Sequence, residues 1–143
     1  MDPDAALARY AAYFDAITRE RLVEMDALFA PDARFRDPFN DVRGIAAIRG
    51  VFLHMYATIE RPRFAILHRA SADDVGYLKW RFTGTVRGRD FDFVGLSEVR
   101  FNPQGLVTEH LDYWDSGTLV YERVPLLGAL VRVIRRRVSA SSH

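Results

Sequence analysis

The alternating pattern in the second half of the chain constrains the fold more than any other feature of the sequence. Four segments there are rich in β-branched and aromatic residues: RFAILHRAS, GYLKWRFTGTVRG, RDFDFVGLSEVRFN and LVTEHLDYWDS. Turn-forming stretches separate them at residues 73–74, 88–90 and 102–105. A period of two is typical of strands with one buried face, and short turns join antiparallel neighbours. The pattern predicts four long antiparallel strands joined by hairpins.

The first half of the chain shows helical spacing instead. After Pro3, apolar residues recur at helical intervals as far as residue 17, and acidic residues stand near the start, where the helix dipole favours them. A second helix is expected over residues 19–29, before Pro31, and a third over residues 45–59, before Pro62. Between these two helices the segment ARFRD alternates and predicts a short strand.

This order of elements predicts an α+β fold. We expect a cone-shaped barrel: a strongly curved antiparallel sheet with three N-terminal helices closing one face, plus a C-terminal helix. A chain of 143 residues is the size of one domain. We therefore expect a single domain over residues 1–138, followed by a polar tail at 139–143.

Composition excludes several classes of function. The chain has 20 basic and 19 acidic residues, a balance that argues against a dedicated nucleic-acid binder. It has no cysteine, which removes disulfides, thiolate nucleophiles and cysteine zinc sites. His54 and His68 lack partners at metal-ligand spacing, so we expect no metal site. We also expect no organic cofactor. Without a signal pattern or an apolar run of about 18 residues, we expect a cytoplasmic protein with no membrane span.

The segment ARFRDPFNDVRG places Asp37 between Phe35 and Phe39, with Pro38 directly after it. Two interpretations remain open for this acid. An Asp-Pro pair after a strand commonly forms a turn or cap. The same carboxylate could instead face an apolar cavity and act as a general base.

Strand alternation groups the other polar candidates. One face of the last strand carries His110, Asp112 and Trp114, whereas the opposite register would turn Glu109 and Asp115 inward. We favour the first register because it places Trp114 beside the aromatic faces of the neighbouring strands. Small residues at 84, 95 and 97 would then leave room for a ligand.

The expected cavity combines a few polar groups with apolar walls, as small-molecule sites do. The candidate acid–base or hydrogen-bonding residues are Asp37, His110, Asp112, Tyr10 and Tyr13. The candidate substrate-binding residues are Phe14, Phe35, Phe39, Phe52, Tyr56, Trp80, Phe82, Phe93, Ser97 and Trp114. For His110, Asp112 and the two tyrosines, a purely structural role remains the alternative.

Three stretches, ALFAPDARFRDP, RGIAAIRGVF and EVRFNPQGLVTEHLDYWD, together with the order of helices and strands, resemble the nuclear transport factor 2-like superfamily over residues 5–117. The resemblance is to its ketosteroid isomerase and SnoaL-like polyketide cyclase branches. It implies that Asp37 matches the isomerase general base and that Tyr10 or Tyr13 matches an oxyanion donor. Ser97 stands where those isomerases carry a second donor, an Asp. The ending TEHLDYWD resembles the cyclases, in which a carboxylate or His acts as acid or base.

The resemblance implies a cofactor-independent enzyme of isomerase, cyclase or hydrolase type acting on an apolar carbonyl-bearing or cyclic ligand, with Asp37 as general base. One alternative is a non-catalytic binding module. Another is a structural dimerisation domain in which the protein's own side chains fill the concave side of the sheet, leaving no cavity near Asp37.

Two surfaces point to partners. Family members pair through the outer sheet face, so we expect a homodimer through this face, which carries Val94, Leu96, Leu111 and Tyr113. The segment VPLLGALVRVIRRRV predicts an amphipathic helix with a basic face. We expect it to dock against the sheet or a neighbouring subunit, with contact to anionic lipid as the alternative.

Overall fold

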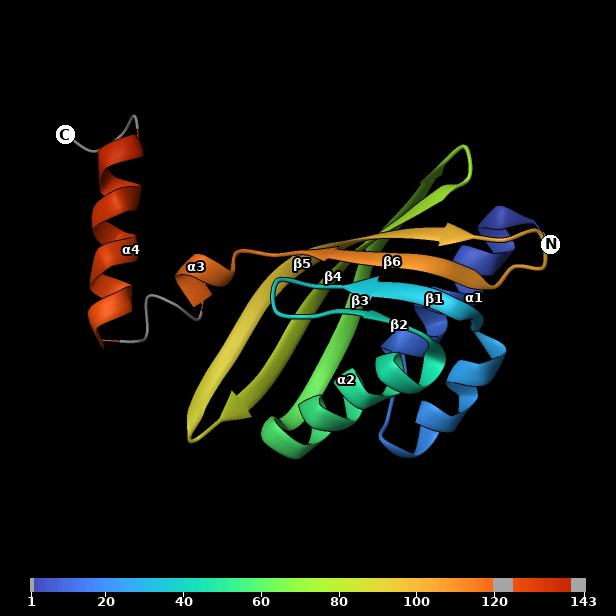
Figure 1. Ribbon diagram of the computed structural model, residues 1–143, viewed down its shortest axis with the longest axis horizontal. Coiled ribbons are helices and arrows are strands. Elements are labelled where there is room, and N and C mark those ends of the chain that lie inside the picture. Colours follow the sequence, from blue (N-terminus) through green and yellow to red (C-terminus); the bar gives the residue numbers. More distant parts are fainter. Residues whose placement is uncertain (1, 120–124, 140–143) are drawn as a thin grey trace.

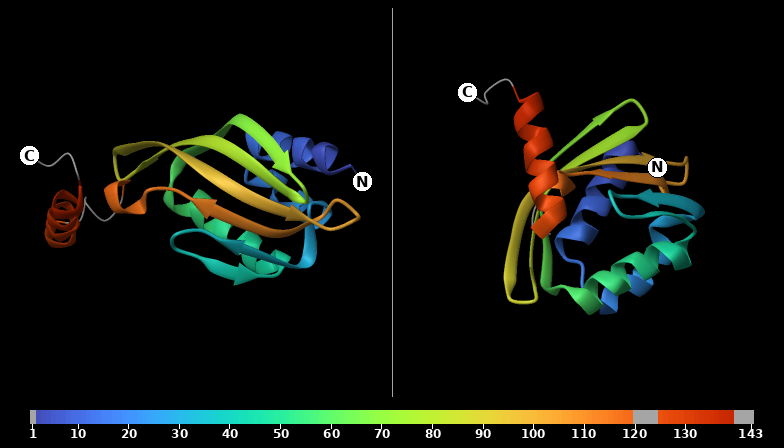
Figure 2. Two further views of the ribbon diagram at one scale, coloured as in Figure 1. Left: turned by 90° about the horizontal axis from the view of Figure 1, so that it is seen from above. Right: turned by 60° about the vertical axis from the view of Figure 1, so that its left-hand side comes forward.

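The computed structural model describes residues 2–119 and 125–139, and its six-stranded sheet has the order β2-β1-β6-β5-β4-β3. In chain order the elements are α1 (Pro3–Asp15), the 3₁₀ helix η1 (Glu20–Ala27), β1 (Phe29–Arg36), β2 (Asp41–Arg43), α2 (Ile45–Thr58), β3 (Glu60–Ala72), β4 (Val75–Val86), β5 (Arg89–Phe101), β6 (Val107–Tyr113), α3 (Ser116–Leu119) and α4 (Pro125–Val138). The sheet curls around the N-terminal helices without closing (Figures 1 and 2). The predicted α+β fold is confirmed.

The first helix is held at its start by the residues that the sequence places there. The Asp2 side chain accepts a hydrogen bond from the Asp4 backbone N–H, and Pro3 occupies the first turn, where its missing N–H costs nothing. The buried stripe of α1 includes Leu7, Tyr10 and Phe14. Helix α1 packs against β3 within the curl of the sheet.

The other two N-terminal helices differ in kind. The predicted helix over 45–59 is confirmed as α2 and buries Ile48 and Phe52. The expected second helix is a 3₁₀ helix, η1, which buries only Leu22 and Met25. Its tighter winding suits a connector that turns the chain from α1 into β1.

The four predicted antiparallel strands are confirmed as β3 to β6. Two features of the sheet were not predicted. Strand β1 pairs parallel with β6, which places Phe35 beside His110, and the three-residue strand β2 extends the sheet beyond β1. The parallel pairing brings the loop after β1 to the end of β6 that carries Asp112 and is followed by Trp114.

Two of the small residues expected to make room for a ligand do not do so. The space above Gly95 is occupied by the indole of Trp80, its direct partner across β4 and β5. The space above Gly84 is occupied by the side chain of Ile59. Both glycines therefore admit a large neighbour, and this part of the prediction is wrong.

Helix α4 lies beyond the end of the sheet rather than over its concave face (Figure 1). Its described apolar side chains Leu130, Val133 and Ile134 are exposed, and Arg135, Arg136 and Arg137 form its basic last turn. The expected docking against the sheet of the same chain is not seen among these side chains. The expected tail at 139–143 lies outside the described residues apart from Ser139, which the structure places directly after α4.

Candidate functional site

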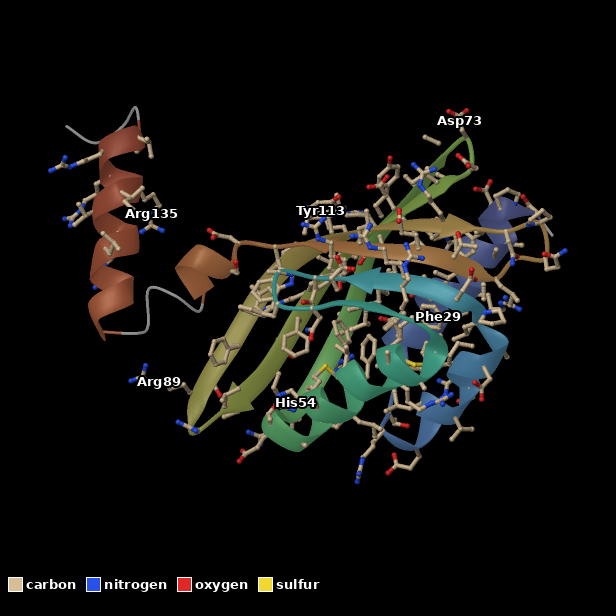
Figure 3. The ribbon with its side chains drawn as sticks, viewed as in Figure 1. Phe29, His54, Asp73, Arg89, Tyr113 and Arg135 are labelled. Carbon is tan, nitrogen blue, oxygen red and sulfur yellow. The ribbon has the colours of Figure 1, made fainter. Side chains whose placement is uncertain are left out.

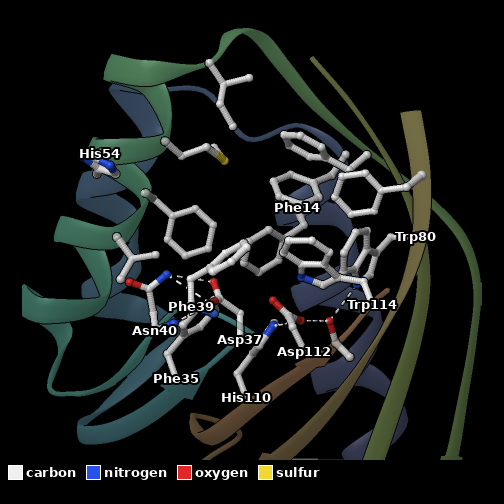
Figure 4. A pocket seen from close by; sticks show the side chains of 18 of the residues that line it. Phe14, Phe35, Asp37, Phe39, Asn40, His54, Trp80, His110, Asp112 and Trp114 are labelled. Carbon is white, nitrogen blue, oxygen red and sulfur yellow. Dashed lines mark hydrogen bonds and ion pairs between the residues drawn. The ribbon is translucent and has the colours of Figure 1, made fainter. Parts of the chain in front are cut away.

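A cavity of about 410 Å³ opens between α2 and the concave face of the sheet (Figure 4). Its walls are predominantly aromatic and aliphatic. The polar side chains that line it are Asp37, Asn40, His54, Thr58, Ser97, His110 and Asp112. An apolar cavity with a few converging polar groups is the usual composition of a small-molecule site.

The register of β6 brings the predicted acid–base residues to this cavity. His110 and Asp112 lie on the inner face, and His110 Nε2 is 2.6 Å from Asp112 Oδ1. The histidine side chain is 5% exposed and the aspartate 14%. The ring of His110 stacks on Phe35, its parallel neighbour, at 4.7 Å between centroids.

Two buried hydrogen-bond donors support this pair from behind. The Tyr10 hydroxyl lies 2.7 Å from His110 Nδ1. On the other side the Ser97 hydroxyl donates to Asp112 Oδ1, and Trp80 Nε1 donates to Ser97 Oγ at 2.8 Å. Ser97 is the direct partner of Asp112 in the β5–β6 register, which accounts for their contact. The five side chains form one network ending on the carboxylate.

The direction of each hydrogen bond follows from donor chemistry. An indole N–H can only donate, so Ser97 accepts from Trp80 and uses its own proton on Asp112. Burial raises the pKa of the Tyr10 hydroxyl well above 10.0, with the Asp112 charge adding to the effect, so this hydroxyl keeps its proton. Among the described residues His110 Nδ1 is the only hydrogen-bond partner of this hydroxyl, so Tyr10 is assigned as the donor to Nδ1, and Nε2–H then donates to Asp112.

This arrangement assigns distinct roles to the two oxygens of Asp112. Oδ1 receives the hydrogen bonds from His110 and Ser97. Oδ2 receives none from the part of the chain that the structure describes. The network therefore holds the carboxyl group of Asp112 in one orientation with one oxygen available to a ligand.

Asp37 combines the two interpretations that the sequence left open. Its Oδ1 accepts from the backbone N–H groups of Phe39 and Asn40, at 2.8 and 2.7 Å, and its own N–H donates to the Asn40 carbonyl at 2.9 Å. The side-chain amide of Asn40 reaches both carboxylate oxygens at 3.1 Å. Asp37 thus closes a turn with Pro38 in its second position, and it also lines the cavity.

Most of the predicted substrate-binding residues line the cavity, but three predicted tyrosines do not. Tyr10 lies behind His110, and the Tyr13 hydroxyl donates to the Arg21 carbonyl at 2.9 Å. Burial raises the pKa of Tyr13 to about 12, and burial also raises the pKa of Tyr56 on α2. The predicted lining residues found in the wall are Phe14, Phe35, Phe39, Phe52, Trp80, Phe82, Phe93, Ser97 and Trp114.

Sequence reasoning missed part of the wall. The residues it did not predict to line the cavity are Asn40, Val51, His54, Met55, Thr58, Ile59, Phe64, Ile66, Leu78 and Val86. Phe64 and Ile66 carry the signal that could have identified them, since they alternate along β3 in step with the inner faces of β4 and β5. Asn40 carries none, because its place depends on the turn that Asp37 closes.

A second, more polar pocket of about 540 Å³ adjoins the first on the outer side of the loop between β1 and β2. The two pockets share Asp37, Phe39, Asn40, Asp112 and Trp114. The ring of Phe39 meets that of Trp114 edge-on at 5.3 Å between centroids. These five shared residues stand where the apolar cavity meets the polar pocket.

Within the described ranges, no group of three or more His, Cys, Asp or Glu side chains is arranged to hold a metal ion. Over the same ranges, no helix is long and apolar enough to cross a membrane.

Known structures share this fold. A protein with a ketosteroid isomerase-like fold from Catenulispora acidiphila, solved in complex with trimethylamine, is 20% identical, with a TM-score of 0.68 over 80% of this chain and 88% of that one. An LEH-like epoxide hydrolase of M. tuberculosis is 17% identical, with a TM-score of 0.68 over 90% of this chain and 96% of that one. A candidate polyketide cyclase from Xanthomonas campestris is 15% identical, with a TM-score of 0.67 over 79% and 90%.

At such identities these structures show the fold alone, and no curated protein matches the chain. Residues 10–110 match the SnoaL-like domain family. This match covers most of the domain, from Tyr10 to His110. The chain therefore belongs to the SnoaL-like domain family.

Proposed function

We propose that the protein is a small-molecule enzyme that performs acid–base chemistry on an apolar carbonyl-bearing or cyclic ligand, with its own side chains as the only catalytic groups. The observation that carries the proposal is the His110–Asp112 pair, hydrogen-bonded at 2.6 Å on the wall of an apolar cavity. A carboxylate held in this way is suited to general-base catalysis. The epoxide hydrolase and the cyclase that share the fold, and the neighbour solved with trimethylamine, support a small ligand here.

In this proposal Asp112 is the general base. Its Oδ2 removes a proton from a carbon beside a carbonyl, or from a water molecule, while His110 and Ser97 hold Oδ1. Returning the proton elsewhere on the ligand gives isomerisation or cyclisation, and activating water gives hydrolysis. Tyr10 and Ser97 act as positioning residues, because their hydroxyl protons are used on His110 and Asp112.

Asp37, the general base expected from the sequence, is the second candidate for that role. One of its oxygens accepts three hydrogen bonds within the turn, whereas Oδ2 accepts only from the Asn40 amide. Asp112 is favoured because its partners orient it through Oδ1 alone, whereas the turn uses both oxygens of Asp37.

Turnover of 5-nitrobenzisoxazole tests the proposal without knowledge of the natural substrate. This neutral, planar, apolar compound loses its C3 proton to a base as its N–O bond breaks, which gives a coloured cyanophenolate. We expect the wild type to turn it over and Asp112→Asn to lower kcat by about 100-fold or more, since general bases contribute about 10²–10⁴-fold. Asp92→Asn on the outer side of β5 is the control and should leave the rate unchanged.

The outcomes separate the two carboxylates. Loss of turnover in Asp37→Asn together with normal turnover in Asp112→Asn would assign the base to Asp37. Binding without turnover in the wild type would favour the binding-module alternative. The alternative of a structural dimerisation domain predicted no cavity near Asp37, and a cavity is present there.

We also propose that two copies pair through the outer sheet face. Val94, Leu96 and Tyr113 are 48%, 41% and 55% exposed, and Tyr113 lies on the side of β6 away from α2 (Figure 3). Apolar side chains gathered on one face mark interaction sites. Leu96→Arg should shift the mass measured by light scattering to that of a monomer, and a wild type that is already monomeric would contradict the pairing.

A further inference from the structure

The apolar cavity has a charge imbalance that the proposed chemistry leaves unexplained. It is lined by two carboxylates, Asp37 and Asp112, and none of its described lining residues is Lys or Arg. Asp112 is hydrogen-bonded to His110 and Ser97, and Asp37 to amide groups. No Lys or Arg among the described lining residues balances these acids, and the histidines on the wall are His54 on α2 and His110, which is already paired with Asp112.

The rings beside Asp37 provide a second reason to expect a cation. Trp114 contacts Phe39 at 5.3 Å and Phe93 at 4.9 Å between centroids, and all three line the cavity. The faces of Trp and Phe rings carry negative quadrupole density and attract cations, and aromatic cages recognise quaternary ammonium groups in this way. Figure 4 shows Asp37 and Asp112 near Phe39 and Trp114, at one side of the cavity.

The position of these groups indicates how a ligand would lie. Asp37, Phe39 and Trp114 stand where the apolar cavity meets the outer polar pocket, so a charged group held there stays close to water. The rest of the cavity is apolar and accommodates an uncharged body. Arg36 lines the outer pocket but not the inner cavity.

We propose that the natural ligand is an apolar molecule carrying a cationic nitrogen, a tertiary or quaternary ammonium group. The nitrogen binds between the Asp37 carboxylate and the rings of Phe39 and Trp114, and Asp112 is left to transfer the proton. The same two carboxylates exclude carboxylate ligands. This inference rests on the proposed function for the role of Asp112, but its test needs binding alone.

Phenyltrimethylammonium and tert-butylbenzene are matched probes, because they have the same shape and differ in charge. Both tryptophans of the chain, Trp80 and Trp114, line the cavity, so intrinsic fluorescence reports its occupancy. A purely apolar cavity would bind the neutral hydrocarbon more tightly, since transfer from water favours it. We expect the reverse, with the cation bound at least tenfold more tightly.

Substitutions assign the preference to the cavity. Asp37→Asn keeps a side-chain oxygen to accept from the turn, so the loop is retained. It should weaken phenyltrimethylammonium about tenfold and change tert-butylbenzene by less than twofold. Asp92→Asn removes a carboxylate from the opposite side of the same sheet and should change neither. A urea titration of each variant checks that folding is unchanged.

Equal or tighter binding of tert-butylbenzene by the wild type would overturn the inference, as would a cation preference that survives in Asp37→Asn. Turnover of 5-nitrobenzisoxazole with a preference for the neutral probe would leave the proposed function standing and reject only the ligand class. A preference for the cation without turnover would reject only the proposed function.

Discussion

His110 and Asp112, two residues apart on β6, place Nε2 and Oδ1 2.6 Å from each other, although both side chains leave the strand on the same face. Residues at i and i+2 share a face of a strand, and their Cα atoms are about 7 Å apart by strand rise. The contact thus depends on side-chain orientation, which Tyr10 and Ser97 fix from opposite ends. The geometry of the pair therefore depends on α1, which carries Tyr10, and on β5, which carries Ser97, as well as on β6.

The role of Tyr10 gives the first prediction. Tyr10→Phe removes the donor to His110 Nδ1 and leaves a buried ring nitrogen without its partner, which costs about 1–3 kcal/mol. We expect the free energy of unfolding in urea to fall by that amount. In turnover of 5-nitrobenzisoxazole, kcat should fall while KM changes little, because the variant loses orientation of the base rather than binding.

Tyr13→Phe is the matched control for this prediction. It removes a hydroxyl of the same helix, but one that donates to the Arg21 carbonyl outside the cavity. We expect a loss of about 1 kcal/mol or less, with kcat unchanged. Equal effects of the two substitutions on kcat would contradict the positioning role of Tyr10.

The glycine beneath Trp80 gives a second prediction. A methyl group at Gly95 would overlap the indole of Trp80, so Gly95→Ala must displace the ring that holds Ser97. Overpacking of this kind costs about 1–3 kcal/mol. We expect lower stability and an altered tryptophan emission spectrum.

Gly50→Ala in α2, where nothing lies within 4 Å of the added methyl, should instead stabilise the protein by about 0.5–1 kcal/mol. Equal emission spectra of Gly95→Ala and wild type would contradict the displacement.

The sequence predicts the parts of this site that depend on neighbouring residues, but not those that depend on contacts between distant segments. Alternation in β4, β5 and β6 correctly places Trp80, Ser97, His110 and Asp112 on one face, because a period of two is a local property of the chain. The hydrogen bonds between these side chains, and their directions, could not be predicted from alternation. They need the β5–β6 register that sets Ser97 opposite Asp112, and the packing of α1 that buries Tyr10.

The loop at Asp37 shows the same limit. Strand β1 ends at Arg36, so the predicted strand and the turn after it were close to correct. The parallel pairing of β1 with β6, which carries this turn to the cavity, joins segments about 75 residues apart by a pattern that no local signal encodes. The turn and the cavity wall were treated as alternatives, whereas Asp37 serves both.

The buried tyrosines predict the response to alkali. The pKa of Tyr13 in the folded protein is about 12 and that of Tyr10 is well above 10.0, because burial disfavours both phenolates. Between pH 10 and 12 the folded state therefore holds protons that the unfolded state releases. Stability from these groups is complete below pH 10 and declines as the pH rises through that window.

Absorbance at 295 nm measures this directly. We expect the native protein to ionise its tyrosines later than the chain unfolded in urea, with Tyr10→Phe and Tyr13→Phe each removing part of the late signal. Unfolding monitored by circular dichroism should begin above pH 10. Coincident titration curves for the native and unfolded chains would contradict the burial of both hydroxyls.

The ring of Phe39 gives the last prediction. Phe39 is 50% exposed and stands with Trp114 between the apolar cavity and the polar pocket. Phe39→Ala joins the two spaces while removing little buried area, so the free energy of unfolding should change by about 1 kcal/mol or less. KM for 5-nitrobenzisoxazole should rise severalfold with kcat nearly constant, because the ring contributes binding and not proton transfer. Val23→Ala on η1, at a side chain 68% exposed and remote from the cavity, should leave both constants unchanged. A fall in kcat with KM unchanged in Phe39→Ala would instead place the ring among the groups that orient the base.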